Sequence, residues 1–191
     1  MTKDKRYIIG VTGTPGSGKS TFAKKLSKSI GAKVIEINDI AIENKFFSKI
    51  DDDNTHVLKI KPLDKYIKKI VNNANEPLIL VGHIIPELTV DFDVIFVIRC
   101  PLDTILKRLQ KRDYNKNKLR ENILSEAFDY CNYNIKKRDC RIIEIESDKD
   151  KHDAIRAIKL QNFNKIKHLE RTNERTEELI KIIKENMWLG L

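Results

Sequence analysis

The stretch GTPGSGKS (13–20) combines glycines, a lysine and a serine at a spacing suited to holding phosphate. It matches the pattern GxxxxGK[ST], follows a short apolar run and opens a segment with helical periodicity, which is the setting this motif requires. Gly13, Gly16 and Gly18 allow the backbone to curl with its N–H groups pointing inward, and the positive end of the following helix adds to their field. The stretch therefore predicts a phosphate-binding loop, or P-loop, for a nucleotide.

Three polar residues that follow the glycines have distinct expected roles. Lys19 is expected to neutralise charge on the β- and γ-phosphates, and the Ser20 hydroxyl is placed to ligate Mg²⁺. Thr21, the next residue, is placed to donate to the α-phosphate. GTPases normally also carry DxxG and NKxD motifs, which the sequence does not contain. A kinase of small molecules instead needs an acceptor site and arginines that close over the transferring phosphoryl group.

Four arginines stand where such a kinase would need them. Arg99 ends an apolar run, and the carboxyl ends of strands border the ligand crevice in open α/β sheets, so its side chain is expected to face the phosphates. Arg108 and Arg112 lie four apart on one predicted helix, and Arg120 lies in the next. They flank a turn short enough to form a small lid, and a guanidinium suits the charge of a transferring phosphoryl group. Taken singly, each arginine is equally well interpreted as a solvated surface residue.

Five apolar runs rich in β-branched residues alternate with segments of helical periodicity. The runs predict strands at 6–13, 33–37, 77–82, 92–100 and 141–147, and the periodic segments predict helices at 19–31, 62–74, 101–112, 116–138 and 150–161. The unbroken run at 92–100 indicates a strand buried on both faces, as in a parallel sheet covered by helices. The pattern predicts a three-layer α/β fold. The stretch NKIKHLER (164–171) fits a sixth strand, or the last strand of the sheet with 141–147 at an edge.

Length and composition indicate one compact domain spanning residues 1–191. With 40% hydrophobic and 34% charged residues, the chain is long enough for one core and short for two. Cys100, Cys131 and Cys140 form an odd set with no metal-binding spacing, which favours reduced thiols in a cytoplasmic protein. No run reaches the roughly 18 apolar residues of a membrane span, so no membrane association is expected. The net charge of +9 favours nucleotide phosphates, RNA or an acidic protein as partners, although it also fits a general excess of lysine.

The chain resembles the adenylate kinase isoenzyme 6 family over roughly residues 7–132. The resemblance rests on GTPGSGKST (13–21), on INDIAIEN (37–44), on GHIIPE (82–87) and most specifically on RLQKRDYNKNKLRENILSE (108–126), which is similar to that family's very short lid. Its eukaryotic and archaeal members are small nucleoside monophosphate kinase-like ATPases linked to maturation of the small ribosomal subunit. This chain departs from the family in having Asp113 where a glycine usually follows the arginine that matches Arg112, so a stiffer lid turn is expected.

The resemblance implies an adenylate-kinase-like P-loop NTPase fold with a five-stranded parallel sheet. ATP would lie on the P-loop with Arg112 near it, the acceptor pocket would use residues 36–60, the lid would span about 110–120, and residues 150–191 would form a C-terminal extension. Asp39 would border the acceptor pocket, with Arg99 and Arg120 as further acceptor-binding residues and Arg108 and Arg112 as catalytic ones. An alternative role for Asp39 is the N-cap of a helix at 40–45.

One departure from the family affects the metal site. Family members commonly carry Asp-x-His at the end of the third strand, and this chain has Val81, Gly82 and His83 there. The resemblance implies that His83 positions the attacking water in ATP hydrolysis, whereas the alternative is a histidine that only stabilises the turn. Without the aspartate, Mg²⁺ is expected to be held mainly by Ser20, ATP and water, with weakened affinity. The side chains of Glu87, Asp39 or His83 would contact its water shell.

Three functional hypotheses follow. The first is a nucleoside monophosphate kinase that transfers the γ-phosphoryl group of ATP to AMP or a similar acceptor. The second is a slow ATPase whose bound state acts as a switch in small-subunit assembly, with a ribosomal protein and rRNA as partners. The third is a non-catalytic, nucleotide-gated RNA or protein adaptor.

The acidic cluster Asp51–Asp53 is interpreted as a solvated loop rather than a metal site.

Overall fold

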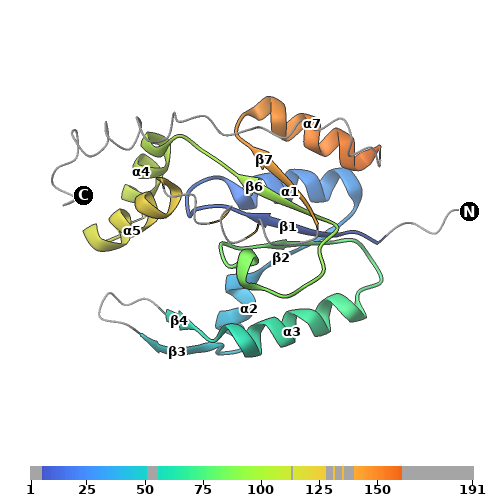
Figure 1. Ribbon diagram of the computed structural model, residues 1–191, viewed down its shortest axis with the longest axis horizontal. Coiled ribbons are helices and arrows are strands. Elements are labelled where there is room, and N and C mark those ends of the chain that lie inside the picture. The colour runs from blue at the N-terminus through green and yellow to red at the C-terminus, as the bar shows by residue number, and fades with distance from the viewer. Residues whose placement is uncertain are drawn as a thin grey trace, which may run out of the picture.

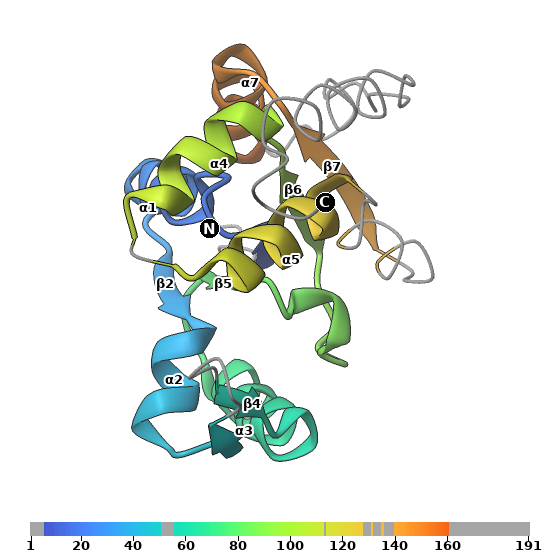
Figure 2. The ribbon, with the colours of Figure 1, turned by 90° about the vertical axis from the view of Figure 1, so that its left-hand side faces the viewer.

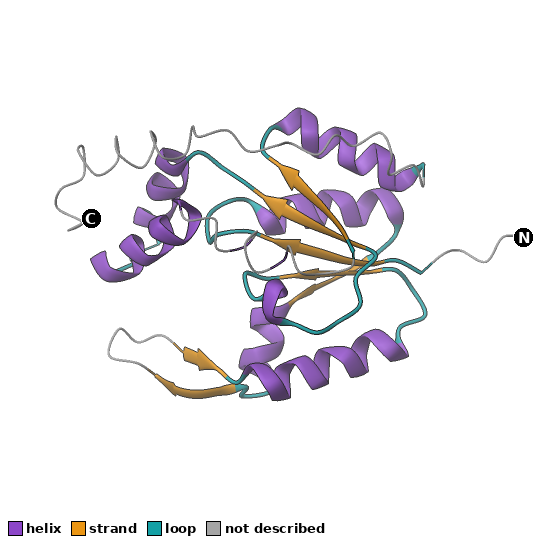
Figure 3. Cartoon of the chain, viewed as in Figure 1, coloured by secondary structure: helices purple, strands orange, loops and turns teal. Residues whose placement is uncertain are grey.

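The computed structural model describes residues 6–50, 56–112, 114–127, 131, 135 and 140–160. Its centre is a parallel sheet with the strand order β2-β5-β1-β6-β7 (Figures 1 and 3). In that order the strands are Lys33–Glu36, Leu78–Val81, Ile8–Thr12, Val94–Ile98 and Arg141–Ile145. Each lies within a segment predicted as a strand, so the five-stranded parallel sheet is confirmed.

Helices connect the strands. They are α1 (Lys19–Ile30), α2 (Ile37–Glu43), α3 (Ile60–Asn73), the short 3-10 helix η1 (Ile85–Glu87), α4 (Leu102–Gln110), α5 (Lys116–Ala127) and α7 (Asp148–Lys159). None of the helices in the described ranges is both long enough and apolar enough to cross a membrane.

The alternation of side chains along each strand divides the core into two halves. Ile8, Leu78 and Leu80 point to one face of the sheet, where α3 packs, while Ile9 and Ile79 point to the other face, which α1 and α7 cover. Figure 1 shows α1 and α7 on one side of the sheet and α3 on the other. The three central strands, β5, β1 and β6, are buried along their whole length, as expected for a parallel sheet covered by helices on both faces. The three-layer α/β fold is therefore confirmed.

The segment after β2 differs from expectation. The helix expected at 40–45 begins at Ile37, so its N-cap is Glu36, and the prediction that Asp39 caps this helix is wrong. A two-stranded antiparallel hairpin that the sequence did not predict follows, formed by β3 (Phe47–Ile50) and β4 (His56–Leu58). Neither strand has the length or regular alternation that distinguishes a strand by pattern alone.

Some expectations lie outside the described residues. These are the interpretations of Asp51–Asp53, the lid residue Asp113, the stretch 164–171 and the part of the C-terminal extension beyond residue 160. Within the described part, β7 pairs with β6 and occupies one edge of the sheet. The end of α4 and the start of α5 are separated by residues 111–115, which matches the very short lid expected from sequence.

Candidate active site

The P-loop joins the carboxyl end of β1 to α1, and three of its glycines have positive φ angles. Gly13 (φ 140°) sits so close to the backbone that an added Cβ would lie 2.3 Å from the carbonyl oxygen of Ile98. Gly16 (φ 87°) packs against Leu109 of α4, and Gly18 (φ 102°) is the N-cap of α1. Because L side chains rarely adopt such angles, glycine is required for this curled backbone.

Lys19 is the first residue of α1, and its ammonium group lies in the curve of the loop. Its Nζ donates a hydrogen bond to the carbonyl oxygen of Thr14 at 3.0 Å. Burial lowers the pKa of Lys19 to about 8, against the attraction of the carboxylates of Glu36 and Glu126, which raises it, while Arg112 adds to the lowering. A cation with weakened solvation is therefore held against the backbone of the loop.

A cavity of about 960 Å³ opens beside the loop and extends in two directions from Lys19. On one side it reaches α2 and the hairpin, where Ile42 and Phe47 line it. On the other side it reaches the start of α7 at Asp148 and Lys151. Figure 2 shows α4 and α5 facing the viewer, with α7 above them and α2 and the hairpin below. The helices that flank the lid, α4 and α5, therefore lie between the two ends of this cavity.

The structure brings two of the four predicted arginines to this cavity. Arg108 and Arg112 both line it. The Nη1 of Arg108 donates to the carbonyl oxygen of Gly16 at 2.8 Å and to the sulfur of Cys100 at 3.6 Å, so this guanidinium also braces the P-loop. Arg112 follows the end of α4, and its positive charge contributes to lowering the pKa of Lys19.

The other two arginines lie elsewhere. Arg99 is buried, with only 1% of its surface exposed, and its Nε lies 3.4 Å from Oε1 of Glu126. Arg120 is exposed on α5. Neither lines the cavity, so the expectation that Arg99 faces the phosphates does not match its position. The residue does stand at the carboxyl end of β6, but its side chain turns into the core to meet Glu126.

The acceptor segment shows a similar shift. Asp39 is exposed on α2 and does not line the cavity, whereas its neighbours Glu36 and Asn38 do. Asn38 and Asp39 are consecutive residues of α2, so their side chains point to different sides of the helix, and Glu36 precedes the helix as its N-cap. The residue matched by the motif is therefore not the one that lines the cavity. Glu87 also lies away from the cavity.

His83 reaches the cavity from the turn after β5. Burial and, to a smaller extent, the nearby positive charge of Lys19 together lower its pKa to about 4. The imidazole is therefore neutral at physiological pH and has a lone pair available to accept a hydrogen bond.

Glu126 was not predicted from the sequence, yet it connects the P-loop to the lid. Its carboxylate is fully buried, accepts a hydrogen bond from Thr14 Oγ1 at 2.6 Å and pairs with Arg99. One signal was available: Leu119, Ile123 and Glu126 recur at helical spacing, which places a charge on the apolar face of α5. A buried charge requires a partner, so this position marked a polar network.

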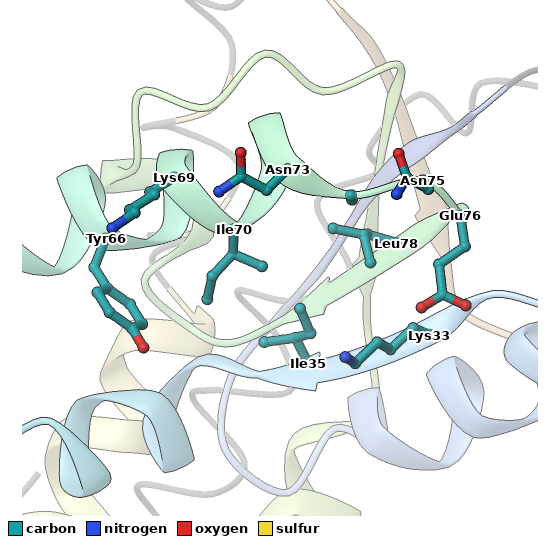
Figure 4. A pocket seen from close by; sticks show the side chains of 10 residues that line it. Lys33, Ile35, Tyr66, Lys69, Ile70, Asn73, Asn75, Glu76 and Leu78 are labelled. Carbon is teal, nitrogen blue, oxygen red and sulfur yellow. The ribbon is translucent and has the colours of Figure 1, made fainter.

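A second cavity, of about 660 Å³, lies between the edge strand β2 and α3. Figure 4 shows Ile35, Ile70 and Leu78 inside it and the polar side chains of Lys33 and Glu76 at one end. No residue of the predicted site lines this cavity. The site is thus assigned to the cavity beside the P-loop.

Comparison with known proteins places the chain in a family. A family model described as an AAA domain matches residues 9–129. An adenylate kinase isoenzyme 6 homolog from Caenorhabditis elegans is 34% identical over 128 residues, which cover 65% of this chain and 69% of the relative. The chain belongs to the adenylate kinase isoenzyme 6 family. A protein of Methanocaldococcus jannaschii named "Putative adenylate kinase" is 38% identical over 124 residues, covering 64% of this chain and 68% of the relative.

Solved structures confirm the fold. Shikimate kinase from Acinetobacter baumannii, in complex with shikimate, superposes with a TM-score of 0.57 at 13% identity, covering 86% of this chain and 97% of that one. A likeness at this identity concerns the fold alone. Together with the family, it establishes a P-loop kinase fold and an enzyme of the kinase class.

The donor set of this family member fits a nucleotide-bound Mg²⁺. The described residues contain no group of three or more His, Cys, Asp or Glu side chains arranged to hold a metal. Mg²⁺ is usually bound by one or two protein oxygens together with phosphate oxygens and water. The Ser20 hydroxyl lines the cavity one residue after Lys19, and Ser17 Oγ, buried in the loop, has no hydrogen-bond partner among the described residues. Both are oxygen donors suited to this type of binding.

We predict that Glu126→Gln lowers the free energy of unfolding by about 3 kcal/mol, because it removes the negative charge that faces the buried Arg99. The change is measured by urea unfolding followed by circular dichroism. Glu121→Gln, an exposed position on the same helix, is the matched control and should change stability by less than about 0.5 kcal/mol. Equal unfolding midpoints for both variants would show that the buried pair does not stabilise the fold.

Proposed function

We propose that this chain is a nucleoside monophosphate kinase that transfers the γ-phosphoryl group of ATP to AMP or a similar acceptor. The observation that carries the proposal is that one cavity extends from Lys19 both toward α7 and toward α2 and the hairpin. A kinase of this type must hold a donor and an acceptor with the transferring group between them. The names of the archaeal and nematode relatives agree with adenylate as acceptor.

The residues around the cavity have complementary roles in this reaction. The N–H groups of the curled loop hold phosphate oxygens, and Lys19 and Arg112 offset the negative charge that spreads over the group in transfer. Arg108 fixes the loop through Gly16 and presents its guanidinium at the same cavity. Ser20 would hold Mg²⁺, which supplies charge neutralisation between the phosphates when it is bound. Catalysis then depends on positioning and electrostatics, with no covalent intermediate.

The acceptor would lie against α2 and the hairpin. Ile42 and Val57 are 60% and 48% exposed, large values for apolar side chains, and Ile42 lines the cavity with Phe47 and Leu58. An apolar wall of this kind suits the face of a nucleoside base, while Asn38 offers an amide to its polar edge. We propose this wall, rather than Asp39, as the base-contacting surface.

We expect Lys19→Ala to lower ATP turnover stimulated by AMP by at least about 100-fold, because it removes the cation at the centre of the loop. Purified protein is mixed with Mg-ATP and each nucleoside monophosphate in turn, and ADP formation is followed with and without the acceptor. Lys24→Ala, which removes an exposed lysine of α1 that does not line the cavity, serves as the control and should retain most of the activity. Full activity of Lys19→Ala would contradict the proposed mechanism.

A second candidate, slow ATP hydrolysis, is favoured by the neutral imidazole of His83. Its low pKa leaves a lone pair at the cavity that can accept a hydrogen bond from an attacking water. The same site then supports transfer to water when no acceptor is bound. This proposal makes hydrolysis a side reaction or a switch, according to what occupies the acceptor side.

We predict that His83→Gln lowers acceptor-independent ADP formation at least about 10-fold and leaves transfer to AMP largely intact. Because the pKa of His83 is about 4, hydrolysis by the unsubstituted chain should show no loss from this group between pH 8 and 6. The rate should fall only as the pH approaches 4 and the imidazole takes up a proton. A variant that hydrolyses ATP normally but unfolds more easily would identify His83 as a turn-stabilising residue instead.

A partner in small-subunit maturation is a further proposal, and it rests on the family resemblance and on the net charge of +9. The chain would act in the cytoplasm on a ribosomal protein bound to pre-rRNA. We expect the tagged chain to retain small-subunit precursors in a pull-down at low salt, and binding to phosphates should weaken steeply as salt rises. Recovery equal to that of an unrelated protein with the same net charge would contradict a specific partnership.

A further inference from the structure

The carboxyl edge of the sheet carries an acidic side chain beside the P-loop. β2 ends at Glu36, which lies opposite Val81, the last residue of β5. Val81 is fully buried, whereas Glu36 is half-buried and lines the cavity shared with Lys19 and Ser20. A carboxylate thus stands one strand away from the position that Val81 fills with an apolar side chain.

The carboxylate of Glu36 makes no contact within the described part of the fold that would explain a charged side chain at this position. The residue occupies the N-cap of α2, yet its side chain makes no capping hydrogen bond, and its extended backbone (φ −79°, ψ 115°) directs the chain from strand into helix. No side chain in the described ranges forms a hydrogen bond or an ion pair with the carboxylate of Glu36. Its charge nevertheless acts on Lys19, where it opposes the effect of burial on the pKa of that lysine.

The other carboxylates near the cavity are differently placed. Glu126 is buried and accepts the hydrogen bond of Thr14. Asp148 is paired with Lys151 at 2.8 Å and its side chain is 93% exposed, at the α7 side of the cavity. Glu121 lines the cavity from the lid helix and is exposed. Among the described residues, Glu36 is therefore the carboxylate that lines the cavity from the end of β2 and forms no ion pair, although its charge acts on Lys19.

We propose that Glu36 accepts hydrogen bonds from the water shell of the Mg²⁺ carried by the nucleotide on the P-loop. The inference rests on the proposed function only in requiring that a Mg-nucleotide binds this loop. Mg²⁺ bound to phosphates keeps several waters, and a carboxylate is a strong acceptor for their O–H groups. Such outer partners orient the bound ion and strengthen its binding. Ser20 would provide the direct oxygen ligand, and Glu36 would accept hydrogen bonds from waters bound to the ion.

The substitution Glu36→Gln is expected to change the affinity for ADP in opposite directions with and without Mg²⁺. Without Mg²⁺, the carboxylate of Glu36 repels the phosphates, so Glu36→Gln should bind ADP as tightly as the unsubstituted chain or more tightly. With Mg²⁺, the variant loses the acceptor for the water shell. The factor by which Mg²⁺ raises the affinity for ADP should therefore fall about 10-fold.

The experiment is isothermal titration of ADP into the full chain with and without Mg²⁺, and it does not depend on catalytic turnover. Glu43→Gln, an exposed glutamate at the end of α2, is the matched control and should keep the full metal effect. Glu36→Asp, which preserves the carboxylate, should restore part of what Glu36→Gln loses. Circular dichroism of each variant verifies that the fold is retained.

The outcomes separate this inference from the function on which it rests. If Glu36→Gln keeps the full metal effect, or weakens ADP binding equally with and without Mg²⁺, the inference is overturned while the nucleotide site stands. The second result would mean that Glu36 only positions Lys19. If the unsubstituted chain binds no ADP in either condition, the proposed function itself is overturned.

Discussion

The buried carboxylate of Glu126 is the interaction on which the arrangement of the site depends. Through Thr14 it fixes the P-loop, and through Arg99 it fixes the carboxyl end of β6 to the lid helix α5. A buried charge is stable only when its partners are held in place, so the loop, strand and helix are constrained together. Arg108 adds a second brace from α4 to the carbonyl oxygen of Gly16. The lid is consequently connected to the phosphate site at two points.

Burial and neighbouring charges also determine the protonation states of the residues that line the cavity. Lys19 is buried deeply enough that its pKa falls to about 8, and the carboxylates of Glu36 and Glu126 oppose this shift from two sides. An anionic phosphate stabilises the protonated form of Lys19, and the protonated lysine in turn stabilises the bound phosphate. His83 remains neutral mainly because burial disfavours its charged form and lowers its pKa, and the positive charge of Lys19 adds to this effect. Each group thereby keeps the protonation state that its proposed role requires.

The comparison with shikimate kinase indicates which parts of the fold are general. At 13% identity the two chains share the sheet and its helices. Shikimate is the molecule named for that kinase, whereas adenylate is named for a relative of this chain. In the proposed reaction the acceptor would lie against α2 and the β3–β4 hairpin, and β3 and β4 form a sheet separate from the main one. On the proposed function, selectivity among acceptors would depend on α2 and the hairpin, while phosphate binding would depend on the P-loop at the edge of the main sheet.

The sequence by itself determined the P-loop, the five strands and the short lid, because each is encoded in contiguous residues with strong local constraints. Gly13 and Gly18 adopt the positive φ angles that the motif implied, and Lys19 lies where its position in the motif placed it. The positions of Arg99, Asp39, Glu36 and Glu126 relative to the cavity were decided only by the tertiary structure. Whether a side chain faces the cavity or the core depends on strand register and on packing between residues far apart in the chain, such as Thr14 and Glu126, and a local pattern contains no information on either.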